Sequence, residues 1–209
     1  MIAPLPDAVL AARLLPLLDH HDPGRVVEWA RAAEAAGAPA VEVALRHPSS
    51  VVALRRSVEA VSIPVGAGTV IEGDQVRASV DAGAAFLVSP GYVPSVAAAV
   101  GTSATPWLPG ASTPTEALRL RDAGASMVKL FPAAALGGPP YVAALAAVVG
   151  LRVVPTGGVT AADAGDYLAV PGVVAVAGSW MFRAAAGGDD DAAAVVAAVR
   201  AALDVTRPA

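Results

Sequence analysis

The sequence lacks cysteine altogether, and it contains a single lysine among its 209 residues. Without cysteine there can be no disulfide, no thiolate metal ligand and no cysteine nucleophile, which is compatible with a cytosolic enzyme. Charged residues make up only 15% of the chain and aromatic residues 4%, so the core must be built from small aliphatic side chains. The net charge of −4 and the lack of a basic stripe argue against a nucleic-acid partner.

Long uninterrupted apolar runs are also missing, although the mean hydropathy of +0.60 is high. The two stretches without formal charge, 82–115 and 130–151, are broken repeatedly by proline and glycine. Neither contains the run of about 20 apolar residues that a transmembrane helix requires, so we expect no membrane partner. Asp7 and Arg13 stand where an export signal needs an apolar stretch, and we therefore expect a cytoplasmic protein.

The chain instead repeats one unit, a short apolar run followed by an alanine-rich helical segment. Strands are expected over 13–19, 41–45, 64–70, 85–89, 105–109, 126–131, 152–156 and 173–177. Helices are expected over 25–36, 49–60, 73–82, 93–100, 114–123, 139–149, 161–169 and 190–203, the last with acidic residues 189–191 at its start. Continuous apolar runs of this kind are typical of parallel strands covered on both faces.

Eight such units predict an α/β protein, a (β/α)8 barrel of the TIM type formed by a single domain over 1–209. The alternative is an open doubly wound sheet. That fold usually carries a G-x-G-x-x-G turn after its first strand, and none is present here. An Ala-Gly-Asp patch at 184–194 indicates a loop and a helix start rather than a linker between domains.

The single lysine, Lys129, lies inside the sixth expected strand. Arginine can replace lysine as a surface charge but not as a nucleophile, because a guanidinium keeps its proton whereas a desolvated ammonium can lose it. Lysine is also rarely buried without a partner. The position therefore predicts a Schiff-base lysine, and the alternative is an accident in a chain with little lysine.

In a barrel of this kind the active site lies at the C-terminal ends of the strands. The second expected strand carries Glu42 there, followed by Arg46 at its exit. Glu42 could be a structural partner that neutralises Lys129, or a general acid/base beside an imine. The two interpretations share one geometry, and the barrel interior favours the catalytic one.

Glycine-rich turns follow the seventh and eighth expected strands, at Thr156-Gly157-Gly158 and Gly178-Ser179. Backbone N–H groups in such turns can approach an anion closely, so the pair of turns predicts a phosphate site. His20, His21 and His47 are interpreted as loop residues beside solvated carboxylates, and we expect no metal site.

Seven motifs resemble, in order and spacing, those of the 2-keto-3-deoxy-6-phosphogluconate (KDPG) aldolases, class I Schiff-base enzymes whose barrel also serves 4-hydroxy-2-oxoglutarate (KHG) cleavage. The resemblance extends over about 13–203. The motifs are VEVALR at 41–46, GAGTV at 66–70, VSPG at 88–91, LPGAST at 108–113, VKLFPA at 128–133, PTGG at 155–158 and GSW at 178–180.

The resemblance implies a role for each matching residue. Lys129 would form the imine with the C2 ketone, and Glu42 would shuttle protons. The substrate would be held by Arg46 and Thr69 at its carboxylate, by Pro90 and Phe131 as pocket walls, and by Thr156, Gly157, Gly158, Gly178 and Ser179 at its distal phosphate. It further implies a homotrimer that acts on a phosphorylated 2-keto acid without a metal or an organic cofactor.

The sequence departs from the family pattern at a few positions. Ala44 and His47 stand where many members have hydroxyl residues, Ala134 stands where a carboxylate is common, and the first strand ends in the acidic Asp19. These changes leave the imine chemistry intact but bear on the aldehyde partner. The galactonate epimer and 4-hydroxy-2-oxoglutarate are therefore alternative substrates, a sugar-phosphate isomerase or epimerase is an alternative enzyme, and a non-catalytic ligand-binding barrel ranks last.

Overall fold

The computed structural model describes residues 5–103, 105–182 and 192–207, and these form an α/β fold with parallel strands. The strands are β1 (Leu14–Leu18), β2 (Val41–Ala44), β3 (Val65–Gly68), β4 (Phe86–Val88), β5 (Trp107–Leu108), β6 (Gly110–Ala111), β7 (Met127–Leu130), β8 (Arg152–Pro155) and β9 (Val176–Gly178). The helices are α1 (Asp7–Ala12), α2 (Pro23–Ala36), α3 (Ser50–Ala60), α4 (Gly73–Asp81), α5 (Pro94–Ser103), α6 (Pro114–Asp122), α7 (Gly138–Val149), α8 (Ala164–Leu168), α9 (Ala192–Thr206) and the short 3-10 helix η1 (Trp180–Phe182).

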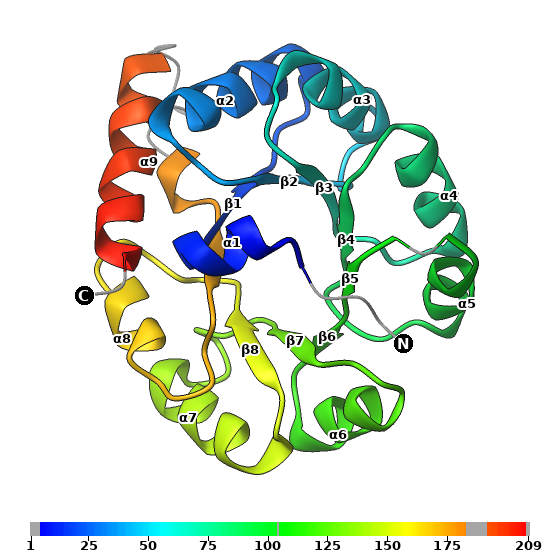
Figure 1. The fold of residues 1–209 in the computed structure, drawn as a ribbon, viewed down its shortest axis with the longest axis vertical. Coiled ribbons are helices and arrows are strands. Elements are labelled where there is room, and N and C mark those ends of the chain that lie inside the picture. The colour runs from blue at the N-terminus through cyan, green and yellow to red at the C-terminus, as the bar shows by residue number, and fades with distance from the viewer. Residues whose placement is uncertain (1–4, 104, 183–191, 208–209) are drawn as a thin grey trace.

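The described strands form a six-stranded sheet in the order β5-β4-β3-β2-β1-β9 and a three-stranded sheet in the order β6-β7-β8. Every pairing between them is parallel. Figure 1 shows the strands curling around a common centre, with helices α2 to α9 on the outside. The predicted α/β class with parallel strands is thus confirmed, and all the strands present their C-terminal ends on one side.

The fifth expected strand differs from the prediction. The sequence predicted one strand over 105–109, whereas the structure has β5 and β6 on either side of Pro109. Proline has no amide hydrogen and interrupts a strand ladder. The carbonyl of Pro109 nevertheless accepts a hydrogen bond of 2.9 Å from the Lys129 amide, so this short segment links the two sheets.

Each expected helix differs from the observed one by one to three residues at a described end. The helix expected over 161–169 is shorter, because the Asp163 carboxylate accepts hydrogen bonds from both the amide and the hydroxyl of Thr160 and holds the chain in a turn. The last helix is described from Ala192 to Thr206. The predicted acidic start at 189–191, and the predicted loop at 184–194 up to residue 191, lie outside the described residues.

The α-helix α1 was not predicted, because six residues are too few to display a helical period. It covers the N-terminal ends of the strands. Leu5 and Val9, both buried, pack there against an inner cluster of strand residues that includes Leu15, Phe86 and Val154. Figure 1 shows α1 lying across the strands in this view. This end of the fold is therefore closed by apolar contacts.

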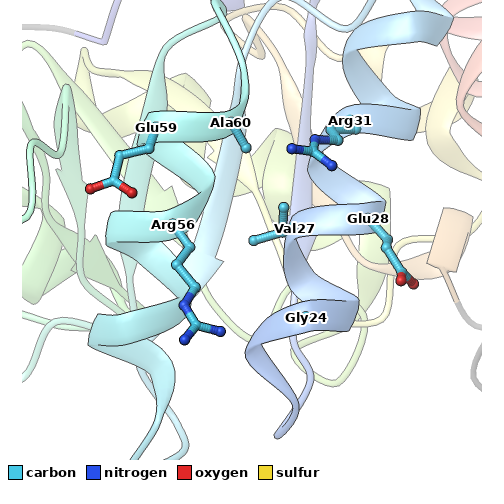
Figure 2. Close-up of a pocket in the computed structure, with 7 residues that line it drawn as sticks. All are labelled: Gly24, Val27, Glu28, Arg31, Arg56, Glu59 and Ala60. Atoms are coloured by element: carbon cyan, nitrogen blue, oxygen red, sulfur yellow. The ribbon is translucent and has the colours of Figure 1, made fainter.

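A groove of about 420 Å³ runs along the outer surface between α2 and α3. Its rim carries charges of both signs, among them Glu28, Arg31, Arg56 and Glu59 (Figure 2). No helix in the described part of the chain has the length and apolar character needed to span a membrane.

Candidate active site

The predicted site residues all lie within a strand or just past its C-terminal end. Glu42 and Arg46 follow this pattern on β2, Thr69 on β3, Pro90 on β4, Lys129 and Phe131 on β7, Thr156, Gly157 and Gly158 on β8, and Gly178 and Ser179 on β9. Because the strands are parallel, these residues occupy the same side of the fold. The sequence therefore placed them on one common face.

The centre of this face is a pair of buried charges. Lys129 Nζ lies 3.6 Å from Glu42 Oε1, and the exposed fractions of the two side chains are 3% and 0%. The two residues come from different sheets, β7 and β2, so the pair crosses the interior between them. A buried ion pair often contributes no net stability, because desolvating both charges offsets their attraction. Its presence is better explained by chemistry than by stability.

The Glu42 carboxylate occupies a space that only a glycine neighbour leaves open. Gly68 pairs with Ala44 in the β2–β3 register, and a Cβ at Gly68 would collide with the Glu42 carboxylate. Both carboxylate oxygens are buried, and within the described residues neither has a hydrogen-bond partner. Buried polar atoms are nearly always satisfied. Apart from the Lys129 amine, 3.6 Å from Oε1, the described residues therefore give the Glu42 carboxylate no polar partner.

Phe131 lies beside the amine and is held by neighbours that the sequence analysis did not identify. Lys129 Nζ is 5.6 Å from the centre of the Phe131 ring, within range of a cation–π contact. The Ser112 hydroxyl donates a 2.6 Å hydrogen bond to the Phe131 carbonyl, and the Tyr141 hydroxyl donates one of 2.6 Å to the Ser112 carbonyl. The feature of the sequence that could have indicated this support is Ser112, a hydroxyl residue in the turn after the fifth expected strand.

Thr69 adopts a strained backbone conformation directly after β3. Its φ is 58°, in the left-handed region that β-branched residues rarely adopt. Such conformations cost about 1–3 kcal/mol and cluster at ligand sites. The conformation is consistent with the role that the family resemblance implies for Thr69.

Arg46 contacts Asp19 rather than the buried pair. Arg46 Nη1 donates a 2.6 Å hydrogen bond to Asp19 Oδ2, and His47 Nε2 lies 3.2 Å from Asp19 Oδ1. Asp19 is a partly exposed loop residue just past β1, and its carboxylate has a partner on each oxygen. Within the described residues, no group of three potential metal-ligating side chains could hold a metal ion.

The turns after β8 and β9 lie side by side. A bridge pairs Thr156 with Ala177, which brings the Thr156–Gly158 turn next to Gly178 and Ser179. Gly157 and Gly158 have φ of 91° and 83°, and a Cβ at Gly158 would lie 2.5 Å from the Ala134 side chain. Glycine is required at both positions by backbone conformation, by space or by both.

The fold and the buried amine–carboxylate pair are what the sequence analysis expects of an α/β enzyme that acts through a lysine. The chain belongs to the KDPG and KHG aldolase family, whose model matches residues 6–198. It is 38% identical to the 2-dehydro-3-deoxy-phosphogluconate aldolase of Pseudomonas aeruginosa over 175 residues, which cover 81% of this chain and 78% of that protein.

Solved structures agree with this assignment. The KDPG aldolase of Zymomonas mobilis ZM4 with 3-phosphoglycerate superposes with a TM-score of 0.89 at 31% identity, covering 96% of this chain and 95% of that one. The KDPG aldolase of Legionella pneumophila, with pyruvate captured as a covalent carbinolamine, superposes with a TM-score of 0.87 at 31% identity, covering 93% and 95% of the two chains. The family suggested by the sequence motifs is confirmed.

Proposed function

We propose that this protein is a class I aldolase that cleaves 2-keto-3-deoxy-6-phosphogluconate reversibly to pyruvate and glyceraldehyde 3-phosphate. The observation that carries the proposal is the buried pair of Lys129 Nζ and Glu42 Oε1, 3.6 Å apart at the C-terminal side of the strands. Relatives named for this activity, such as the Pseudomonas aeruginosa enzyme, support the substrate.

The first half of the reaction builds the imine. The uncharged Lys129 amine attacks the C2 ketone and forms a carbinolamine, which loses its oxygen as water to leave a protonated imine. The carbinolamine captured with pyruvate in the Legionella pneumophila relative supports an intermediate of this type. Glu42, with two oxygens free of hydrogen bonds in the described structure, can take up and return the protons that these steps exchange.

The second half breaks the carbon–carbon bond. Glu42 removes the proton of the C4 hydroxyl, which becomes the aldehyde of glyceraldehyde 3-phosphate. The electron pair of the C3–C4 bond moves into the protonated imine and gives an enamine. Returning the proton to C3 restores the imine, and its hydrolysis releases pyruvate and the free Lys129 amine.

Substrate binding would use the groups at both sides of the pair. Arg46, with its planar fork of N–H donors, suits the pyruvate carboxylate, together with Thr69. Pro90 and Phe131 would line the pocket. The adjacent turns of Thr156, Gly157 and Gly158 and of Gly178 and Ser179 would hold the phosphate through backbone N–H groups.

We also infer that the strands close into an eight-stranded barrel within a single domain. The segment around Pro109 supports closure on one side, and the bridges Val153–Val173 and Thr156–Ala177 support it on the other. By the family resemblance we propose a homotrimer, and from the cysteine-free sequence a cytoplasmic enzyme. Sedimentation equilibrium of the purified protein tests the oligomer, and a monomer would contradict it.

The competing substrates are 4-hydroxy-2-oxoglutarate, which the family name includes, and the galactonate epimer of the phospho-sugar acid. Measuring kcat/KM on the three compounds ranks them directly. We expect the gluconate compound to give the highest value.

The decisive test of the Schiff base is chemical trapping. The protein is incubated with pyruvate, reduced with borohydride and analysed by mass spectrometry of the intact chain and of its peptides. We expect a mass gain of one reduced pyruvate, located on Lys129, and none in Lys129→Arg. An unmodified wild-type protein would exclude the imine mechanism.

A further inference from the structure

The loops after β1 and β2 are joined by contacts that the proposed reaction does not yet use. Asp19, one residue past β1, receives a 2.6 Å hydrogen bond from Arg46 Nη1 on one oxygen and has His47 Nε2 3.2 Å from the other. A second link lies nearby, where the Ser49 hydroxyl donates a 2.6 Å hydrogen bond to the His21 carbonyl. The two loops are therefore held together at several points.

We propose that Asp19 is a positioning residue that fixes the Arg46 guanidinium for the carboxylate of the 2-keto acid, with His47 holding Asp19 in turn. The inference rests on the proposed aldolase function. It assigns a role to the acidic end of the first strand and to the histidine after Arg46, the two departures from the family pattern that lie at this side of the site.

The geometry of Arg46 supports positioning. Its side chain is 42% exposed, and an exposed arginine samples many rotamers unless a partner restricts it. Asp19 engages the guanidinium only through Nη1, and the described residues offer it no other hydrogen bond. A guanidinium has five N–H donors in one plane, so the remaining ones can still pair with a planar carboxylate.

The contact between His47 and Asp19 indicates that Asp19 does not compete with the substrate for Arg46. A carboxylate that merely occupied Arg46 in the free enzyme would have to leave when the substrate arrived. Asp19 is anchored by His47 on its second oxygen, and its side chain is only 24% exposed. The structure therefore favours a carboxylate that stays beside Arg46 while the substrate binds.

The test compares Asp19→Ala and Asp19→Asn with the wild type. Half-saturation by pyruvate is measured by borohydride trapping, and KM and kcat are measured for cleavage. Because a misplaced binding group mainly weakens substrate capture, we expect Asp19→Ala to raise both the pyruvate half-saturation and KM about tenfold, with kcat within about threefold. The amide oxygen in Asp19→Asn can still accept from Arg46, so we expect most of the loss to be restored.

A matched control is Asp204→Ala, which removes another aspartate paired with an arginine, 3.6 Å from Arg207 at the far end of α9. It should leave KM and kcat unchanged. The Asp204 pair is fully exposed and the Asp19 pair includes an exposed arginine, and ion pairs open to solvent contribute little to stability, so neither variant should melt at a clearly lower temperature.

The outcomes separate this inference from the proposed function. A wild type that traps pyruvate together with an Asp19→Ala variant of unchanged KM overturns the positioning role alone. A lower KM in Asp19→Ala also overturns it, because this result identifies Asp19 as a competitor for Arg46. A wild type that traps no pyruvate overturns the aldolase proposal and this inference with it.

Discussion

The N-terminal ends of the strands are covered by apolar side chains, whereas the C-terminal ends carry polar and charged ones. At the N-terminal end, Leu5 and Val9, just before and within α1, pack on an inner cluster of aliphatic and aromatic side chains. At the C-terminal end, a buried lysine faces a buried carboxylate whose oxygens have no hydrogen-bond partner among the described residues. The first arrangement stabilises the fold, whereas a buried ion pair often contributes no net stability. We therefore expect substitutions at the N-terminal end to lower the stability of the fold, and substitutions at the C-terminal end to lower turnover.

The largest effect is expected for Lys129→Arg at the C-terminal end. It keeps a positive charge beside Glu42 but removes the only lysine amine in the chain. Turnover should fall by about four orders of magnitude or more, as when a nucleophile is removed from other enzymes. Steady-state kinetics measures the loss, and circular dichroism confirms the fold. Turnover within about tenfold of the wild type would mean that Lys129 is not the nucleophile.

Glu42→Gln should have the next largest effect. The amide keeps the shape of the side chain but cannot accept a proton, so kcat should fall by about 10²–10⁴-fold. The control is Glu59→Gln, the same change on the outer groove of Figure 2. If both variants kept wild-type turnover, Glu42 would be only the structural partner of Lys129.

Arg46→Ala should act on binding more than on chemistry. Hydrogen bonds to charged groups contribute about 1.5–3 kcal/mol, so KM for the keto acid should rise by about 10–100-fold with a smaller change in kcat. Arg56→Ala, which removes an arginine from the outer groove, is the matched control and should leave KM unchanged (Figure 2). A similar rise in both variants would indicate a general effect of net charge rather than a carboxylate site.

The difference between the two ends also explains what the sequence could predict. Lys129 and Glu42 stood out because charged residues are rare inside apolar strands, and the repeated strand–helix unit predicted a barrel whose site lies at the C-terminal ends of its strands. The closing helix α1 is too short to carry a periodic signal, and the break at Pro109 depends on a ladder that only the tertiary structure defines. The double contact of Asp19 was likewise hidden, because it joins residues 27 and 28 positions apart in two loops.

Val9→Ala tests the N-terminal end. Val9 is fully buried against the inner cluster, and removing two methyl groups there should lower the free energy of unfolding by about 1–2 kcal/mol. Since α1 lies at the opposite end from Lys129, kcat and KM should stay at wild-type values. Denaturant unfolding and steady-state kinetics measure the two effects. A loss of turnover in the folded variant would show that the two ends are coupled.

The smallest effect is expected at Glu116, in the first turn of α6 beside the site. Hydrogen bonds from the backbone N–H of Ser112, and then of Thr113, hold the pKa of the Glu116 carboxyl below its usual range despite partial burial. A lowered pKa contributes stability above the ordinary pKa of glutamate, and that contribution is lost as the pH falls through the pKa of the folded state.

Glu116→Gln should therefore lower the melting temperature slightly at pH 7, by an amount corresponding to about 0.5–1 kcal/mol for a helix-capping contact. The two proteins should converge as the pH is lowered through the pKa of the folded state, below which the wild-type carboxyl is also protonated. Thermal melts over this pH range measure the difference, with Glu59→Gln as the exposed control. A difference that stayed constant with pH would assign the effect to the shape of the cap rather than to its charge. The stability of this part of the C-terminal end would then depend on hydrogen-bond geometry and not on the charge of Glu116.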